Sequence, residues 1–283
     1  MKETAWARAQ RLGDTQLARR MPSINAAESG PLGSMVQTDA SHQATLQTVL
    51  RVLSSNGVRV RQVCVGRAFD PTQCDMVITV GGDGTFLWAS HSLSATPILG
   101  VNSAPATSTG FFCAASAQTF SERWKQIEQG SLPRSRIARM CVWRGKEVVA
   151  DRVLNEVLVA SRSPAAMTRL GVTLGAEEAH FRSSGIWVGP PAGSSAAMAS
   201  AGGQPLALTS RTLQWVVREA VGGPSQALAR GVLLPKAKLQ VRVESRDVRM
   251  FVDGGKRPHV LQVGDELRFS ESPEPLHAWT PAF

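Results

Sequence analysis

The chain of 283 residues is long enough for one large domain or two ordinary ones, and it can bury a sizeable core. Hydrophobic residues make up 43% and charged residues 19%, which is typical of a globular protein, and no apolar run approaches the roughly 20 residues of a membrane helix. The net charge of +9 favours anionic partners such as nucleotides, or a basic surface without a specific partner, whereas no Lys/Arg run with interleaved aromatic residues supports nucleic acid.

The cysteines predict neither a disulfide framework nor a metal centre. Cys64, Cys74, Cys113 and Cys141 are scattered, none forms a CxxC pair, and no histidine lies at zinc-ligand spacing. We expect reduced, mostly buried thiols in a soluble, cytoplasmic protein without membrane or nucleic-acid partners. We also expect no metal that is held by a ligand motif of the chain itself.

Helices and strands alternate through the first half of the chain. Residues 42–53 carry apolar side chains at helical spacing, and Asn56-Gly57 is a typical helix end. Two later strands are short and nearly continuously apolar, as expected in a parallel sheet covered on both faces. In chain order we predict a surface helix at 1–21, a loop at 22–38, a helix at 42–53, strands at 58–65 and 75–80, a helix at 86–92, a strand at 96–102 and a helix at 116–130.

The second half alternates apolar and polar residues with period two, which predicts mostly β structure. We predict a hairpin at 137–149, strands at 153–159, 170–174, 239–243, 248–252 and 267–269, a short helix at 196–201 and an irregular tail from Pro273. The predicted fold class is therefore an α/β N-terminal domain with a mainly parallel sheet, residues 1–115, and a β-rich C-terminal domain, residues 116–283. The C-terminal tail could return to the first domain.

A glycine-rich turn, Gly81-Gly82-Asp83-Gly84-Thr85, follows the predicted strand at 75–80. Ligands of α/β sheets bind at the carboxyl ends of the strands, and glycines can adopt positive φ and carry no Cβ to keep phosphate oxygens off the backbone. The next helix offers an N-terminal anion site. A carboxylate repels phosphate, so we interpret Asp83 as accepting the proton of an attacking hydroxyl, or as helping to hold a metal, during phosphoryl transfer. The alternative is a tight turn with Asp83 as the N-cap.

The sequence VGGDGTFL resembles the signature of NAD kinases and of their superfamily relatives, the diacylglycerol-type lipid kinases, sphingosine kinases and phosphofructokinases. In that superfamily the motif's Asp serves the transferred phosphoryl group. The resemblance thus implies a catalytic role for Asp83, and we expect Gly81, Gly82, Gly84 and Thr85 to bind the phosphates of ATP together with Mg²⁺.

Further segments resemble NAD kinases in particular. In lipid kinases an Asn-Glu pair usually follows GGDGT within a few residues, whereas here Asn155-Glu156 lies far downstream, as in NAD kinases. The similarity covers roughly residues 42–270. The segments that carry it are 97–102 with Gly110-Phe111, 154–157, 184–188, 191–196, 200–203 and 250–254.

Several positions depart from the usual family pattern. Ser184 stands where the family usually has Asp, Pro190 and Ala192 where it has Thr, and Ala197 where it has Tyr. The segment that follows Asn102 is also longer than usual. The longer segment, together with Ser-Ser-Gly in place of Asp-Gly, resembles the mitochondrial-type branch of NAD kinases and its bacterial relatives.

The resemblance implies an NAD site that is mostly in the second half of the chain. An amide both donates and accepts hydrogen bonds and a carboxylate accepts two, so Asn155 and Glu156 suit ribose hydroxyls and an adenine edge. Alternatively, this pair bonds to loops at a strand end, and residues 189–195 lead into a tightly packed helix with a serine cap. Asn102 could bond a nicotinamide ribose or a loop carbonyl. The residues expected to hold NAD are Asn102, Asn155, Glu156, Ser184, Ala192, Gly193, Ser194 and Ser195.

Other polar residues are interpreted without a functional role. Asp253 precedes two glycines, and an Asp-Gly pair is usual turn chemistry. Arg182 could neutralise a pyrophosphate but is assigned to the surface. The five histidines, His42 and His91 among them, have no evident partner in the sequence.

The expected function is that of an NAD kinase, which transfers the γ-phosphoryl group of ATP to the 2′-hydroxyl of the adenosine ribose and converts NAD to NADP. The resemblance also implies a homodimer or homotetramer that pairs through the β-rich half. One alternative is another kinase with the GGDGT motif, acting on a lipid or a small molecule. The other is a dinucleotide-binding relative without catalysis, which the residues Ser184, Pro190 and Ala197 suggest.

Overall fold

The computed structural model describes residues 1–2, 4, 31–221, 228–255 and 258–280. The chain divides into two compact units, one comprising Met1–Ser135 with His277–Phe283 and the other Arg136–Leu276. The predicted helix at 1–21 lies almost wholly outside the described residues.

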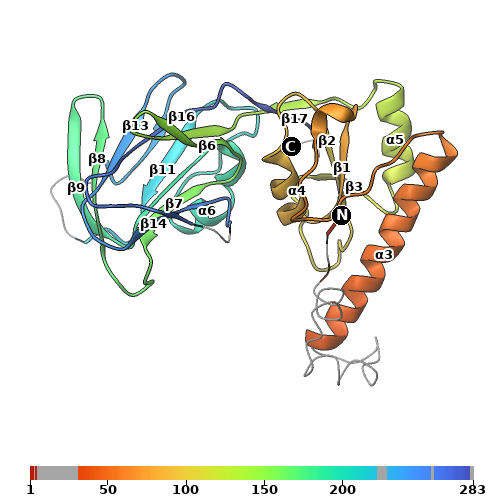
Figure 1. Ribbon diagram of the computed structural model, residues 1–283, viewed down its shortest axis with the longest axis horizontal. Coiled ribbons are helices and arrows are strands. Elements are labelled where there is room, and N and C mark those ends of the chain that lie inside the picture. Colours follow the sequence, from red (N-terminus) through yellow and green to blue (C-terminus); the bar gives the residue numbers. More distant parts are fainter. Residues whose placement is uncertain (3, 5–30, 222–227, 256–257, 281–283) are drawn as a thin grey trace. The chain divides into compact units, whose positions relative to one another are not determined.

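The first unit is an α/β layer built on a five-stranded sheet of order β1-β2-β17-β4, in which β3 also pairs with β2 (Figure 1). The pairs β1–β2, β2–β3 and β2–β17 are parallel. The strands are β1 Val77–Gly81, β2 Ile98–Asn102, β3 Cys113–Ser116, β4 Ser135–Ile137 and β17 Leu276–Trp279. The helices are α3 Pro31–Ser55, the 3-10 turn η2 Pro71–Gln73, α4 Asp83–Ser90 and α5 Phe120–Glu128.

Helices cover both faces of this sheet, which explains the continuous apolar runs of its strands. Val80 on β1 and Leu99 on β2 pack in one buried cluster with residues of α3 and α5, such as Val49 and Phe120. Figure 1 shows α4 on the opposite face, where Phe86 lies against β2 at Gly100. Packing against this buried sheet therefore fixes the position of α4 and of the glycine-rich turn that precedes it.

The second unit consists of two six-stranded antiparallel sheets. Their orders are β12-β11-β10-β7-β14-β15 and β6-β5-β16-β13-β8-β9. The first sheet contains β7 Val157–Ser161, β10 Ile186–Gly189, β11 Leu213–Val217, β12 Arg230–Leu233, β14 Val248–Val252 and β15 His259–Val260. The second contains β5 Met140–Arg144, β6 Glu147–Val153, β8 Thr168–Leu174, β9 Glu177–Ser183, β13 Leu239–Val243 and β16 Glu266–Glu271. The turn η3 Pro191–Gly193 and the short helix α6 Ala197–Ser200 follow β10.

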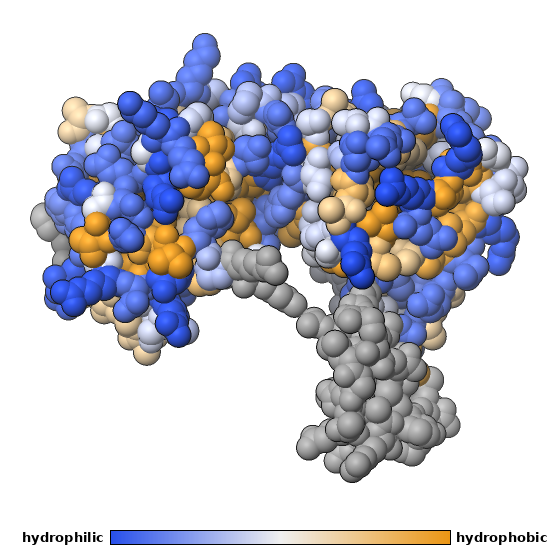
Figure 2. Space-filling model, in the orientation of Figure 1, coloured by the Kyte–Doolittle hydropathy of each residue, from blue (hydrophilic) through white to orange (hydrophobic). Residues whose placement is uncertain are grey.

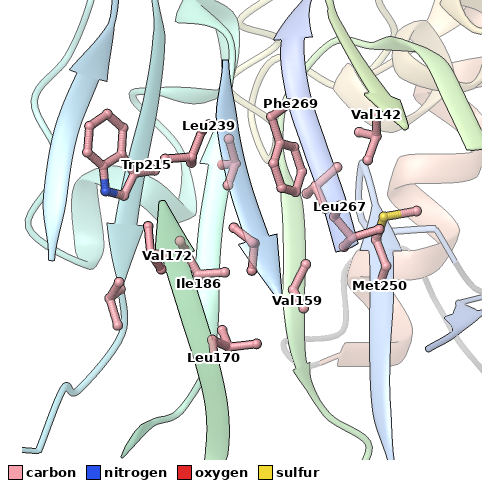
Figure 3. Packing of buried hydrophobic residues seen from close by; sticks show 14 of the residues in the cluster. Val142, Val159, Leu170, Val172, Ile186, Trp215, Leu239, Met250, Leu267 and Phe269 are labelled. Carbon is pink, nitrogen blue, oxygen red and sulfur yellow. The ribbon is translucent and has the colours of Figure 1, made fainter. Parts of the chain in front are cut away.

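The two sheets pack face to face through one hydrophobic core. Figure 3 shows Val159 and Ile186 of one sheet directed toward Val172 and Leu239 of the other. Each of these four side chains is fully buried, and such burial contributes about 1.5–3 kcal/mol per residue. Hydrophilic residues cover most of the visible surface, with smaller hydrophobic areas between them (Figure 2).

The predicted fold class is confirmed, but several local predictions are wrong. Residues 31–38 belong to α3 and not to a loop, because Pro31 occupies the first turn, where a missing N–H does no harm. Residues 58–65 form no strand; Val63 and Val65 exchange backbone hydrogen bonds with Met1, and Val58 N donates back to Leu53 O of α3. The tail after Pro275 is not irregular, since β17 joins the parallel sheet.

The division between the units also differs from the sequence-based boundary at residue 115. It falls between Ser135 and Arg136, because α5 packs on α3 and β3 in the first unit. The assignment of one unit to ATP and the other to NAD stays a prediction.

The thiols differ from the expectation as well. All four cysteines are free, but Cys64 and Cys74 are exposed and only Cys141 is buried.

Candidate functional site

The glycine-rich turn joins the carboxyl end of β1 to the first turn of α4. Gly82 is the N-cap of α4, and Asp83 is its first residue. The turn does not use the freedom of glycine to adopt positive φ, since Gly82 has φ −121° and neither Gly81 nor Gly84 is among the positive-φ glycines of the described chain. Close packing explains the first two glycines: a Cβ on Gly81 would overlap the Thr85 hydroxyl, and one on Gly82 would lie 2.9 Å from Ser108 Oγ.

Gly84 differs from its two neighbours. A Cβ at this position would have no atom within 4 Å, and the residue is exposed. The bare backbone therefore faces open space in the first turn of α4, where N–H groups and the helix dipole attract anions. Thr85 is buried, and its side chain packs beside Gly81.

Asp83 is half-buried, and both of its carboxylate oxygens accept backbone hydrogen bonds. Phe111 N donates to Oδ2 over 3.0 Å, and Phe112 N donates to Oδ1 over 2.9 Å. The Phe112 ring stacks on Phe86 of α4 with centroids 4.9 Å apart. The carboxylate thus fixes the end of the 103–112 loop against α4, and the loop in turn fixes the orientation of the carboxylate.

Asn102 ends β2 directly beside Gly81, its partner in the parallel ladder. The side chain is buried; its amide donates to Ser108 O over 2.9 Å and accepts from Ala104 N over 3.0 Å. Of the two interpretations of Asn102, the structure displays the bond to a loop carbonyl. Asn102 and Asp83 therefore hold opposite ends of the same lengthened loop.

His42 is a structural residue that the sequence did not identify. It is 2% exposed, and its Nδ1 lies 3.0 Å from Ser103 Oγ. Burial lowers the pKa of its imidazole, and the positive charges of the N-terminus and Lys2 lower it further. A buried His–Ser pair between a helix and a loop has no sequence signature at this separation.

In the second unit, Asn155 and Glu156 occupy a bend between β6 and β7, and not the inside of a strand as predicted. The carboxylate of Asp253 holds this bend. Its Oδ2 accepts from Leu154 N at 2.9 Å, and its Oδ1 accepts from Asn155 N at 2.7 Å and from Glu156 N at 3.0 Å. The interpretation of Asp253 as turn chemistry alone is therefore incomplete.

Two acceptors at this bend are buried without a hydrogen-bond donor among the described residues. They are Asn155 Oδ1 and Glu156 Oε2. Burial, followed by the negative charge of Asp253, raises the pKa of Glu156 from 4.5 to about 7. An orphaned buried acceptor is unfavourable, so the bend is suited to a ligand that brings donors.

The turn η3 packs directly on this bend. A Cβ on Gly193 would overlap the backbone carbonyl of Asn155, so only glycine permits the contact. Ala192 is buried and Ser195 is exposed. The Ser194 hydroxyl is bonded within the protein, because it donates to Pro191 O over 2.6 Å and accepts from Leu206 N over 2.8 Å.

Ser184 is not brought to this bend within the chain. It precedes β10, whereas η3 follows it, and the antiparallel pairing of β10 with β7 places Val188 beside Val157 and Ile186 beside Val159. Ser184 therefore lies beyond the opposite end of β10 from Gly189. Its backbone N–H donates to Arg218 O over 3.0 Å. Arg182, in β9, is exposed.

The described residues contain no cluster of three or more His, Cys, Asp or Glu side chains that could hold a metal ion. None of their helices is both long and apolar enough to span a bilayer.

Residues 2–132 match the family model of the ATP-NAD kinase N-terminal domain. The probable NADH kinase of Oryza sativa subsp. japonica is 34% identical over 220 residues, which cover 69% of this chain and 68% of that protein. The NADH kinase of Arabidopsis thaliana is 30% identical over 263 residues, or 84% and 83% of the two chains. The NAD kinase of Rhodopirellula baltica is 29% identical over 212 residues, or 72% and 66%.

Two solved structures share the fold. Yeast NADH kinase complexed with NADH has a TM-score of 0.68 at 15% identity, with 86% of this chain and 80% of that chain covered. An NAD kinase from Archaeoglobus fulgidus in complex with ATP has a TM-score of 0.69 at 22% identity, with 83% and 89% covered.

Proposed function

The chain belongs to the NAD kinase family, and from this premise we propose that it transfers the γ-phosphoryl group of ATP to the 2′-hydroxyl of the adenosine ribose of NAD. The products are ADP and NADP. The relatives include both NAD kinases and NADH kinases, so NADH is the competing acceptor.

The observation that carries this proposal is the pair of orphaned acceptors at the β6–β7 bend. Adenosine offers donors in its ribose hydroxyls and in its 6-amino group, and a buried acceptor gains most from such a donor. Asn155 Oδ1 and Glu156 Oε2 lie on consecutive residues and are both buried. Ala192, Gly193 and Ser195 of the adjoining η3 segment would complete this side of the NAD site.

At the other motif, the exposed backbone of Gly84 and the N–H groups of the first turn of α4 would hold phosphate oxygens of MgATP. Magnesium enters this scheme as part of the nucleotide substrate. Asp83 would orient the attacking hydroxyl and accept its proton late in the transfer, because a carboxylate is a weak base at neutral pH. The two N–H donors of Phe111 and Phe112 favour this role, since they fix the carboxylate before substrate arrives.

A direct assay tests the proposal. The purified protein is incubated with MgATP and either NAD or NADH, and the phosphorylated product is read through an NADP-specific dehydrogenase. We expect turnover that Asp83→Asn lowers by a factor of about 100 or more, with the fold intact.

Three outcomes would contradict parts of this scheme. Unchanged turnover in the Asp83→Asn variant would refute the role given to Asp83. A parent protein that binds NAD but turns over neither NAD nor NADH would favour the non-catalytic relative, and activity on liposomes or on small alcohols alone would favour another GGDGT kinase. Pairing into a homodimer or homotetramer through the β-rich unit stays a prediction, which light scattering during gel filtration would check.

A further inference from the structure

The Asp253 carboxylate accepts hydrogen bonds from three consecutive backbone N–H groups at the bend between β6 and β7. These donors belong to Leu154, Asn155 and Glu156, and lie 97 to 99 residues away along the chain. The backbone of Asp253 returns the contact, because its N–H donates to Glu156 O over 2.9 Å. Four hydrogen bonds thus tie the end of β14 to the bend that carries both orphaned acceptors.

From this geometry we infer that Asp253 is a positioning residue for the proposed reaction: it fixes the 154–156 bend so that the Asn155 amide and the Glu156 carboxylate present acceptors to a single adenosine. The inference rests on the proposed function. It assigns Asp253 no contact with the substrate, and its effect is exerted through the backbone of the bend.

The three hydrogen bonds to the bend require a carboxylate at residue 253, because an amide has only one acceptor oxygen. Both oxygens of Asp253 are used, and Oδ1 accepts from two N–H groups. Asparagine has a single acceptor oxygen, so its amide nitrogen would face Leu154 N, donor against donor. Asp253→Asn should therefore keep two of the three side-chain bonds and lose the one that holds the start of the bend.

The charge of Asp253 acts on two neighbours at once. It acts on a second, buried carboxylate, that of Glu156, and on the Arg139 guanidinium. Asp253 also adopts a left-handed φ of 47°, which an aspartate tolerates in a turn before glycine. The elements packed on the bend, β10 and η3, contain no titratable side chain.

The inference predicts a specific dependence of NAD binding on pH. Ionised Glu156 accepts two donors, whereas the protonated form accepts fewer, so NAD affinity should rise with pH through the Glu156 titration near pH 7. Asp253 contributes to the raised pKa of Glu156. Removal of its charge should therefore move the midpoint of this transition to lower pH.

The test is calorimetric titration of NAD and, separately, of MgATP into the parent protein, Asp253→Asn and Asp247→Asn between pH 6 and 8.5. Asp247 is a matched control, since it lies at the opposite end of β14 with a similar left-handed φ of 58°. We expect Asp253→Asn to weaken NAD binding about tenfold or more, to leave MgATP binding unchanged and to shift the pH midpoint downward. Asp247→Asn should match the parent in all three respects.

Equal NAD affinity and an equal pH midpoint in the parent and Asp253→Asn would overturn the inference, as would an equal loss of NAD binding in Asp247→Asn. Hydrogen exchange on the parent provides a check that needs no variant: the amides of residues 154–156 should exchange slowly without ligand, and rapid exchange there would refute the hydrogen bonds to Asp253. If the parent binds neither NAD nor NADH, the proposed function itself fails, and the inference fails with it.

Discussion

Replacement of Glu156 by glutamine should stabilise the ligand-free protein at alkaline pH. In the folded protein, burial and Asp253 raise the pKa of Glu156 from 4.5 to about 7. The folded state therefore binds the proton more tightly than the unfolded state, and the stability of the protein falls as the pH rises from 4.5 to 7. Below pH 4.5 both states are protonated and the penalty is absent, whereas above pH 7 it is complete.

The size of the effect follows from the shift. A pKa raised from 4.5 to about 7 corresponds to about 3 kcal/mol of unfolding free energy above pH 7. Glutamine resembles the protonated carboxyl group in size and carries no charge to desolvate. We therefore expect Glu156→Gln to raise the free energy of unfolding by up to about 3 kcal/mol at pH 8, and by close to zero at pH 4.5.

Urea unfolding at constant ionic strength, followed for the parent and Glu156→Gln at several pH values from 4.5 to 8, measures this difference. Glu177→Gln is the control, because Glu177 is exposed on β9 in the same unit. A difference between Glu156→Gln and the parent that is equal at pH 4.5 and pH 8 would refute the reasoning. A less stable variant at pH 8 would show that Glu156 has a favourable partner in the folded protein.

Three other substitutions test separate parts of the structure. Gly84→Ala should leave the free energy of unfolding unchanged or raise it by up to about 1 kcal/mol, because the added Cβ meets open space in a helical turn. The same Cβ should raise the KM for ATP about tenfold, because it would occupy space proposed for phosphate oxygens; thermal melts and ATP titrations measure the two effects. Gly193→Ala should weaken NAD binding and destabilise the protein by about 1–3 kcal/mol, because its Cβ would overlap Asn155 O, and NAD calorimetry with urea unfolding would show both. Arg139→Met should cost about 3 kcal/mol in urea unfolding, because the Arg139 guanidinium is wholly buried, donates to Glu274 O over 2.6 Å and pairs with the Glu274 carboxylate at 3.9 Å.

The periodicity of apolar residues predicted those helices and strands whose buried face is visible in their own sequence. The helical spacing of residues 42–53 and the left-handed Gly57 place the end of α3 correctly, and the apolar runs at 75–80 and 96–102 mark β1 and β2. The same criterion failed for β17. Two prolines precede this strand, and its pairing with β2 and β4, both far away along the chain, makes its four residues part of a sheet.

The glycine turn shows a different limit of sequence reasoning. The motif was recognisable, but the reasons for its glycines were not. Gly81 and Gly82 make room for the hydroxyl groups of Thr85 and Ser108, while only Gly84 leaves its backbone open. A sequence shows only that a residue is glycine. It does not show whether the space of the missing Cβ is filled by other protein atoms or is open to a ligand.

Asp83 and Asp253 explain why the remainder of the site was beyond sequence reasoning. Each carboxylate binds the backbone N–H groups of a remote segment, 28 residues away for Phe111 and 97 or more for the β6–β7 bend. Side-chain partners leave a trace in residue type, whereas every residue except proline offers an N–H, so such a bond has no signature of its own. The apolar residues on either side of Asn155-Glu156 therefore suggested one unbroken strand. In the folded chain the Asp253 carboxylate takes the N–H groups of the bend, and the polar pair lies where neither β6 nor β7 continues.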